Sequence, residues 1–206
     1  MVDSICDWLL KKITENDPSI DEEKSEIIYY GLQNIVGELP KGLIILLIAW
    51  ICGVFNLVVI GTIVLLIYRG FAGGVHLKTH ITCIITSVIL VIGSAFLAKR
   101  LLFETPFLIY TTLMVINIAL AMLYAPADTE NRPIMKEVQR KRQKIESVSM
   151  VAFIYFLSMF VIKEQCISNL CMYMLTVESF MITPVAYKIF DNKSGEERRN
   201  EILKSM

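Results

Sequence analysis

The sequence predicts an all-α integral membrane protein, a helical bundle of about six transmembrane helices, with five as the alternative. Three observations predict this class. The 206 residues are 55% hydrophobic and only 19% charged, whereas a soluble domain carries about 25% charged residues. The apolar residues are concentrated in windows whose length suits a bilayer. The basic and acidic residues, 20 of each, lie mostly outside those windows.

Composition also excludes several other classes of protein. The pI of about 6.7 provides no basic excess for phosphate contacts, so no nucleic acid is expected as a partner. The five cysteines are spread along the chain, which argues against a scaffold held by disulfides. The high apolar content excludes a disordered chain.

Residues 1–40 are predicted to form amphipathic helices at the cytoplasmic face of the membrane. Ile5, Trp8 and Ile13 recur at helical spacing, and a second helix is expected over 22–38. These helices either lie on the membrane surface or pack against loops of the same protein, and both alternatives stay open. The segment has no basic start followed by an apolar run, so no signal peptide is expected.

Five apolar windows follow, and a window of about 20 residues crosses a hydrocarbon core of about 30 Å. They cover residues 42–68, 81–98, 105–124, 147–162 and 165–187. The first window is long for one span and short for two, but Gly53 and Asn56 offer a place for a hairpin to turn. A hairpin there gives six spans, and an unbroken helix gives five.

The distribution of basic residues predicts the topology. Lysines and arginines are most frequent in 125–146 and 188–206, which places both segments in the cytoplasm. Counting spans backwards puts 99–104 outside and 69–80 inside. We therefore expect a single domain over 1–206, with a transmembrane bundle at 41–190 and a cytoplasmic tail at 191–206.

The candidate chemistry lies in 69–83. The two histidines of the chain, His76 and His80, lie within seven residues of Cys83, and an imidazole can activate a thiol as a nucleophile. His80 is a helical neighbour of Cys83, whereas His76 would be about 10 Å away along a continuous helix. Geometry alone therefore favours His80, unless Gly73 and Gly74 fold His76 back. The alternative is that Cys83 is a small apolar filler.

A second candidate is Glu178, an acid inside the last apolar window. Ionisable residues in spans are costly and therefore suggest function. We expect Glu178 to pair with Arg69 or Asn117, or to line a polar cavity, and Pro184 to kink this helix.

Two motifs resemble the accessory gene regulator B family of bacterial membrane endopeptidases, which process quorum-sensing propeptides. The first is Arg69-x-x-x-Gly73-Gly74-x-His76 followed by Cys83, and the second is the segment from Tyr124 to Ile134, YAPADTENRPI. The resemblance covers roughly residues 25 to 190. It implies that Cys83 is the nucleophile and His76 its base, which reverses the geometric preference and leaves His80 as the fallback base. Residues 73–80 then cannot all form one straight helix.

The resemblance implies a thiol protease, a hydrolase of the bacterial cell membrane with its active site on the cytoplasmic side. It would remove the C-terminal tail of an autoinducing-peptide precursor through a thioester and support cyclisation to a thiolactone or lactone. Gly73 and Gly74 are expected to supply oxyanion donors, and Arg69 positive charge. The implied partners are the propeptide, the bilayer and a second copy in a homodimer. No metal or organic cofactor is expected.

The basic residues after the second motif have two interpretations. They include Lys136, Arg140, Lys141, Arg142 and Lys144. They can steer an acidic substrate tail, or they can serve only as a topology signal, which is the favoured interpretation. Two other function classes also compete: a small permease or exporter without proteolytic activity, in which Glu178 and Asn117 line a path, and a non-catalytic assembly subunit.

Overall fold

A computed structural model describes residues 2–17, 20–75, 77, 80–101, 106–128, 134, 136–192, 194–195 and 199. Within these ranges the regular elements are helices, which confirms the all-α class. The chain divides into two compact units, Met1–Ile48 and Ala49–Met206. Each unit is described by itself below.

The first unit contains α1 (Val2–Asn16) and most of α2 (Glu22–Ile51). The predicted amphipathic face of α1 is only partly covered, because Ile5 and Trp8 are exposed whereas Cys6 is buried. The ammonium group of Lys12 lies 4.5 Å from the centre of the Trp8 ring. The helix expected over 22–38 does not stop there. It continues through Pro40 to Ile51, because a proline removes one bond of the helical ladder and the residues after it can restore the ladder.

A tight turn follows α2 and leads into α3 (Phe55–Ala72). Gly53 has a φ of 67°, a conformation that suits glycine. The N–H of Val54 donates to the carbonyl of Ala49 at 2.9 Å, which closes the end of α2. The window 42–68 is therefore broken at Gly53 into two helices, which is the break that one of the two sequence alternatives requires.

Among the described residues, four helical segments are long and apolar enough to cross a membrane: Phe55–Ala72, Ile81–Arg100, Pro106–Tyr124 and Glu137–Val161. They correspond to α3, α4 (His80–Arg100), α5 (Pro106–Tyr124) and α6 (Glu137–Phe156), which a π-helical turn, η1 (Leu157–Val161), extends. A shorter apolar segment, Leu39–Ile51, forms the end of α2. The next helix, α7 (Gln165–Met181), has 17 residues.

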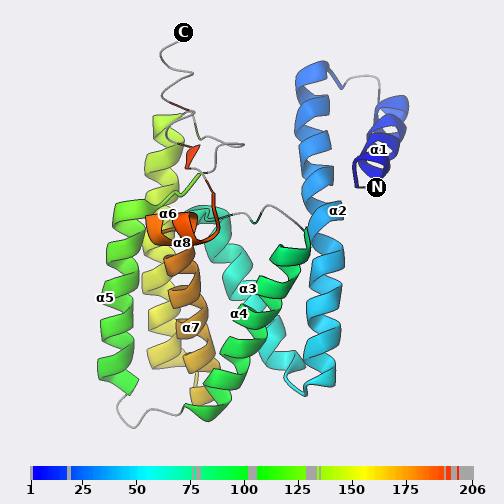
Figure 1. Ribbon diagram of the computed structural model, residues 1–206. Coiled ribbons are helices and arrows are strands. Elements are labelled where there is room, and N and C mark those ends of the chain that lie inside the picture. The colour runs from blue at the N-terminus through cyan, green and yellow to red at the C-terminus, as the bar shows by residue number, and fades with distance from the viewer. Residues whose placement is uncertain are drawn as a thin grey trace. The chain divides into compact units, whose positions relative to one another are not determined.

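Helix α7 is the centre of the second unit (Figure 1). It contacts α3, α4, α5 and α6. Its buried positions include polar residues, and these are paired: Tyr110 of α5 donates to the side-chain oxygen of Asn169, and Ser168 donates to the carbonyl of Ser158 at 2.9 Å. Buried polar groups need such partners, and here these pairs join α7 to α5 and η1.

The sequence suggested that Pro184 kinks a continuous helix, and this prediction is wrong. Helix α7 ends at Met181, and Pro184 instead begins the short helix α8 (Pro184–Ile189). Thr183 caps α8, because its hydroxyl accepts a hydrogen bond from the N–H of Ala186 at 3.3 Å. A proline costs nothing at the first helical position, where no N–H partner exists.

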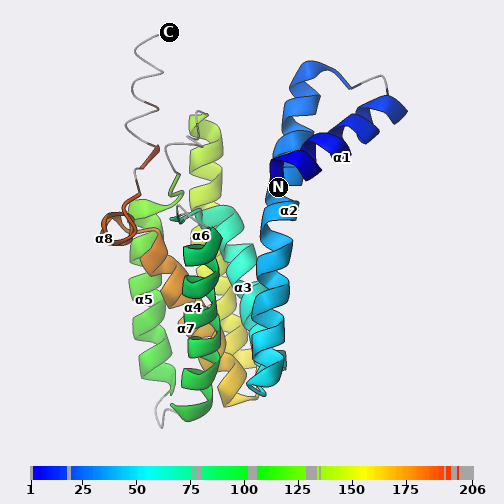
Figure 2. The same cartoon turned by 45° about the vertical axis from the view of Figure 1, so that its right-hand side comes forward.

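The predicted cytoplasmic segments meet at one end of the bundle (Figure 2). The N–H of Gly74 donates to the carbonyl of Ala127 at 3.0 Å, and the N–H of Gly195 donates to the carbonyl of Asp128 at 3.1 Å. At the other end, Lys99 donates to the carbonyl of Gly53 at 3.1 Å. Parts of 69–80, 125–146 and 188–206 thus lie together, in agreement with the predicted alternation of spans.

Candidate functional site

Two glycines end α3 and turn the chain out of the helix. The φ angles of Gly73 and Gly74 are 72° and 136°, which side chains other than glycine rarely adopt. The N–H of Gly73 still donates to the carbonyl of Arg69 at 2.9 Å. A Cβ atom on Gly73 would lie 2.3 Å from the carbonyl oxygen of Ala127. Only glycine therefore allows this close approach of two backbones.

Main-chain hydrogen bonds hold the segment after α3 to two distant parts of the chain. Ala127 donates to the carbonyl of Ala72 at 2.8 Å and accepts from the N–H of Gly74. Val75 donates to the carbonyl of Met181 at 3.2 Å, at the end of α7. Both glycine N–H groups thus have carbonyl partners. Serving an oxyanion, as the sequence suggested, would require them to exchange those partners.

Arg69 connects this segment to the centre of the bundle. Its Nη1 lies 3.5 Å from Oε1 of Glu178, and its Nη2 donates to the carbonyl of Val75. The side chain of Glu178 is only 3% exposed. At the neighbouring position of each helix, the hydroxyls of Tyr68 and Ser179 lie 3.1 Å apart. Helices α3 and α7 are therefore joined by two adjacent polar pairs, and one of them also fixes Val75.

The predicted base and nucleophile lie directly after this fixed segment. His76 falls outside the described residues, and His80 begins α4, although its side chain is not described. Cys83 lies in the first turn of α4 and is half-buried. The chain leaves the helix at Gly73 and Gly74, and α4 begins only at His80. Residues 73–80 therefore do not form one straight helix, and the assignment of His76 as the base requires this break.

The face of α4 that carries Cys83 is turned toward the same segment. Val75 belongs to a buried cluster with Met181, Ala186 and Tyr187, and Leu90 of α4 packs against this cluster. Leu90 lies seven residues after Cys83, so the two share one face of the helix. The cluster that contains the residue before His76 thus contacts the helix face that carries Cys83, seven residues further along α4.

The polar residues expected to line a transport path are instead engaged inside the bundle. Glu178 pairs with Arg69, one of the two predicted partners, and Asn117 donates to Thr176 at 3.2 Å. Both residues are almost fully buried. Neither lines either of the two pockets near α8 and Arg140. The structure thus gives both residues a role in helix packing.

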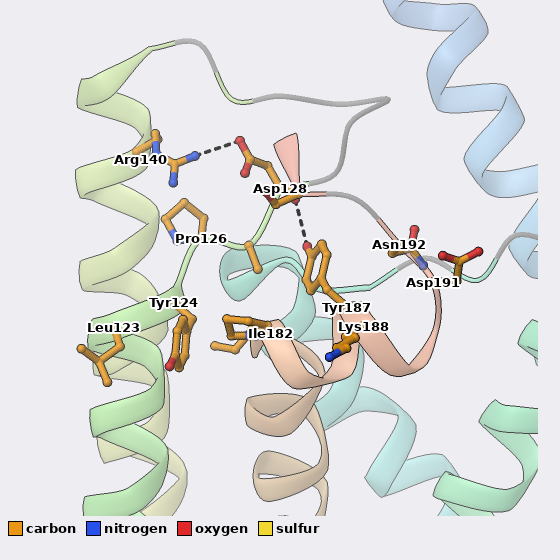
Figure 3. Close-up of a pocket in the computed structure, with 13 residues that line it drawn as sticks. Leu123, Tyr124, Pro126, Asp128, Arg140, Ile182, Tyr187, Lys188, Asp191 and Asn192 are labelled. Carbon is orange, nitrogen blue, oxygen red and sulfur yellow. Dashed lines mark hydrogen bonds and ion pairs between the residues drawn. The ribbon is translucent and has the colours of Figure 1, made fainter. Parts of the chain in front are cut away.

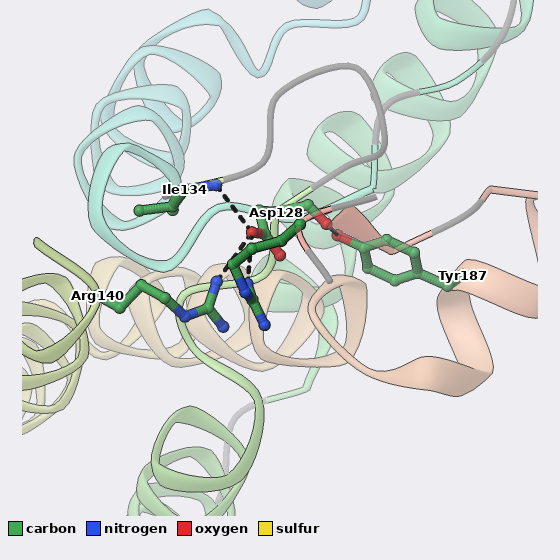
Figure 4. Close-up of polar contacts among 5 residues, drawn as sticks. Asp128, Ile134, Arg140 and Tyr187 are labelled. Carbon is green, nitrogen blue, oxygen red and sulfur yellow. Dashed lines mark hydrogen bonds and ion pairs between the residues drawn. The ribbon is translucent and has the colours of Figure 1, made fainter. Parts of the chain in front are cut away.

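Asp128 is a buried polar centre that sequence reasoning missed (Figure 4). Its Oδ2 accepts hydrogen bonds from Arg140 at 2.8 Å, from the N–H of Ile134 at 2.9 Å and from Arg199 at 3.2 Å. Burial and the nearby charge of Asp128 raise the pKa of Tyr187 to about 12, so its hydroxyl stays a donor. The available signal was an acid close before a run of basic residues.

Two adjacent pockets share Arg140 and Pro126. The larger, of about 570 Å³, lies between the end of α5 and α8 and includes Tyr124, Ile182 and Tyr187 (Figure 3). The smaller, of about 320 Å³, includes Arg140, Lys141, Lys144 and Arg199. Of the predicted tail-binding residues, Arg140 and Lys141 thus line a pocket. Lys136 and Arg142 line neither, and Arg142 instead pairs with Glu146 at 2.7 Å.

The chain is similar to known proteins over most of its length. Residues 5–182 match the family model described as accessory gene regulator B. The chain belongs to this family. It is 27% identical to protein FsrB of Enterococcus faecalis over 202 residues, which cover 98% of this chain and 82% of the relative. It is 30% identical to accessory gene regulator protein B of Staphylococcus aureus over 135 residues, or 65% and 69% of the two chains. No solved structure matches.

Membership in the accessory gene regulator B family assigns the chain to quorum-sensing peptide processing. The apolar helices fit the membrane location of this family. The matched region ends at Ile182, so it contains the Arg69–Glu178 pair and the whole segment from Gly73 to Cys83.

Proposed function

We propose that this chain is a membrane-embedded cysteine endopeptidase that removes the C-terminal tail of an autoinducing-peptide precursor and supports its cyclisation. Cys83 is the nucleophile and His76 the base. One observation carries the proposal: Val75, which precedes His76, is held at both its N–H and its carbonyl, and it packs in the cluster that contacts the Cys83 face of α4. Because the chain leaves α3 at Gly73 and α4 begins at His80, the separation of about 10 Å that a straight helix over 76–83 would impose does not apply.

In the first step, the His76 imidazole takes the proton of the Cys83 thiol, and the thiolate attacks the scissile carbonyl carbon. The carbon–nitrogen bond then breaks, and the same proton passes to the departing amine of the tail. The products are the free tail and a thioester between Cys83 and the rest of the peptide.

In the second step, a cysteine thiol within the bound peptide attacks the thioester carbonyl. A new thioester forms inside the peptide, the bond to Cys83 breaks, and the proton of the attacking thiol passes to the Cys83 sulfur. The product is a thiolactone, or a lactone when the peptide nucleophile is serine. No water is consumed, so exclusion of water from the site would protect the thioester from hydrolysis.

The Arg69–Glu178 pair acts in this proposal as a positioning element. The buried carboxylate holds the guanidinium, which donates to the carbonyl of Val75. Charge-assisted hydrogen bonds of this kind are stronger than neutral ones. They fix the backbone directly before the base, and small displacements of catalytic groups are costly to rate.

The proposal includes a site on the cytoplasmic side of the cell membrane and a homodimer as the working form. The support for the cytoplasmic side is the concentration of lysines and arginines at the end of the bundle where Gly73 meets Ala127. Binding of the propeptide tail by Arg140 and Lys141 stays a prediction.

The test compares three variants in proteoliposomes containing the propeptide. Cys83→Ala and His76→Ala should abolish tail release, whereas His80→Ala should retain most of it. Cys52→Ala is the matched control, because Cys52 is an exposed thiol in the turn between α2 and α3, at the opposite end of the second unit. Normal cleavage by Cys83→Ala would refute the proposal, and a larger loss in His80→Ala than in His76→Ala would reassign the base.

A further inference from the structure

The smaller pocket carries an excess of positive charge that takes no part in the two chemical steps of cleavage and cyclisation. Four cationic side chains, Arg140, Lys141, Lys144 and Arg199, line it together with one acid, Glu137. Asp128 lies behind it and pairs with both arginines. Counting these six groups leaves two positive charges. In the part of the chain that the structure describes, neither Lys141 nor Lys144 has a carboxylate partner.

Asp128 fixes the two arginines without occupying all their donors. Nη1 of Arg140 and Nη1 of Arg199 approach the same carboxylate oxygen, Oδ2, at 2.8 and 3.2 Å. A guanidinium has five N–H donors, so most of them remain for a ligand. Because Asp128 already holds the two arginine side chains, binding of an anion restricts the motion of little more than the two lysine side chains. Planar, fixed guanidinium groups are well suited to phosphate oxygens.

The pocket also lies at the depth of lipid headgroups. The uncharged part of the helix formed by α6 and η1 begins at Ser147. At 1.5 Å per residue, Lys144 lies about 5 Å and Arg140 about 10 Å outside that point. The polar layer on each side of a bilayer is roughly 5–8 Å thick. Lys144 and Lys141 therefore lie in or at the edge of this layer, beside a helix that crosses the membrane.

We propose that this pocket binds the headgroup phosphate of an anionic phospholipid from the surrounding membrane. A ligand already confined to the headgroup layer meets the pocket by lateral diffusion. The net positive charge favours an anionic lipid over a zwitterionic one, since basic residues near a membrane surface attract anionic lipids. A soluble phosphate or an acidic peptide segment shares part of this chemistry, and the experiment separates them.

The test uses the full chain in nanodiscs of phosphatidylcholine, with or without phosphatidylglycerol, and native mass spectrometry counts the lipid retained. Neutralising one lysine should weaken phosphatidylglycerol retention about fivefold, and Lys141→Gln with Lys144→Gln about 25-fold. The arginines are left unchanged because they also support Asp128. Arg142→Gln is the matched control, because Arg142 lies on the same helix and lines neither pocket. It should change retention less than about twofold.

Three results would overturn the proposal. The double variant could retain phosphatidylglycerol as the native chain does, or Arg142→Gln could lose as much as the pocket lysines, which would indicate a diffuse surface effect. The native chain could also fail to prefer phosphatidylglycerol. In parallel arms, glycerophosphate or a glutamate-rich peptide is added to lipid-free, detergent-solubilised protein. Pocket-dependent binding there, with unchanged lipid retention, would assign the site to a soluble anion or to a peptide.

Discussion

Arg69 of α3 and Glu178 of α7 form an ion pair at 3.5 Å, and the same guanidinium donates to the carbonyl of Val75. The pair therefore connects the most central helix of the second unit to the residue before the proposed base. Removing one partner of a buried pair leaves an uncompensated charge, so the two side chains depend on each other. This dependence leads to a prediction about rate.

Glu178→Gln should lower kcat for propeptide cleavage by about 10- to 100-fold with little change in KM, because the base loses its position while the substrate surface is unchanged. Arg69→Gln should have a similar effect. The double variant should lose scarcely more than either single one, since the two residues act as a unit. Steady-state kinetics in proteoliposomes measure all three variants.

The control for this prediction is Asn117→Ala. Asn117 is also a buried polar residue that bonds to α7, but its partner there is Thr176 rather than a residue of the Arg69–Glu178 pair. A merely structural role for Glu178 would make the two variants alike in kcat. Additive losses from Arg69→Gln and Glu178→Gln would likewise contradict the positioning role.

Gly73→Ala should nearly abolish cleavage. Its Cβ would lie 2.3 Å from the carbonyl oxygen of Ala127, on a backbone with a φ of 72°, so the contact between 73–75 and the end of α5 must open. Gly70→Ala is the matched control, because a Cβ there meets nothing within 4 Å and alanine favours the helix. Cleavage assays together with melting temperatures in detergent compare the two. Equal activity in both variants would show that the close approach is not required.

Asp128→Asn should lower the free energy of unfolding by about 2–4 kcal/mol, because it leaves two arginines without their shared carboxylate. Glu146→Gln removes an ion pair on an exposed helix face, whose Arg142 side chain is 77% exposed, and should cost about 0.5 kcal/mol or less. Thermal unfolding in detergent measures both. If the melting temperature of Asp128→Asn equals that of the native protein, the Asp128 centre does not stabilise this end of the bundle.

Local sequence signals predicted the features that depend on neighbouring residues. The turn at Gly53 follows from a glycine in an overlong apolar window, and the break after Ala72 follows from Gly73 and Gly74 together with the His76 assignment. The pairing of Arg69 with Glu178 was predictable because a charged residue inside a span needs a partner.

Features that depend on distant contacts were not predictable. The bonds from Gly74 to Ala127 and from Val75 to Met181 join segments far apart in the sequence, and no local pattern marks them. The end of the helix expected at residue 38 and the role of Pro184 were predicted wrongly for a related reason: a proline can be accommodated within a helix or can begin one, and packing of the flanking residues decides. Asp128 was missed because its three partners come from separate segments.

The most direct measurement of the central claim is mass spectrometry of the protein trapped during turnover. The propeptide used carries serine in place of its internal cysteine, which slows cyclisation. The account predicts that the N-terminal fragment of the propeptide is attached to the peptide containing Cys83. Hydroxylamine should release this fragment as a hydroxamate, as it does for a thioester. Two results would contradict the account. One is an adduct on Cys52, Cys166 or Cys171. The other is tail release that occurs without a covalent adduct in the native protein and is undiminished in Cys83→Ala.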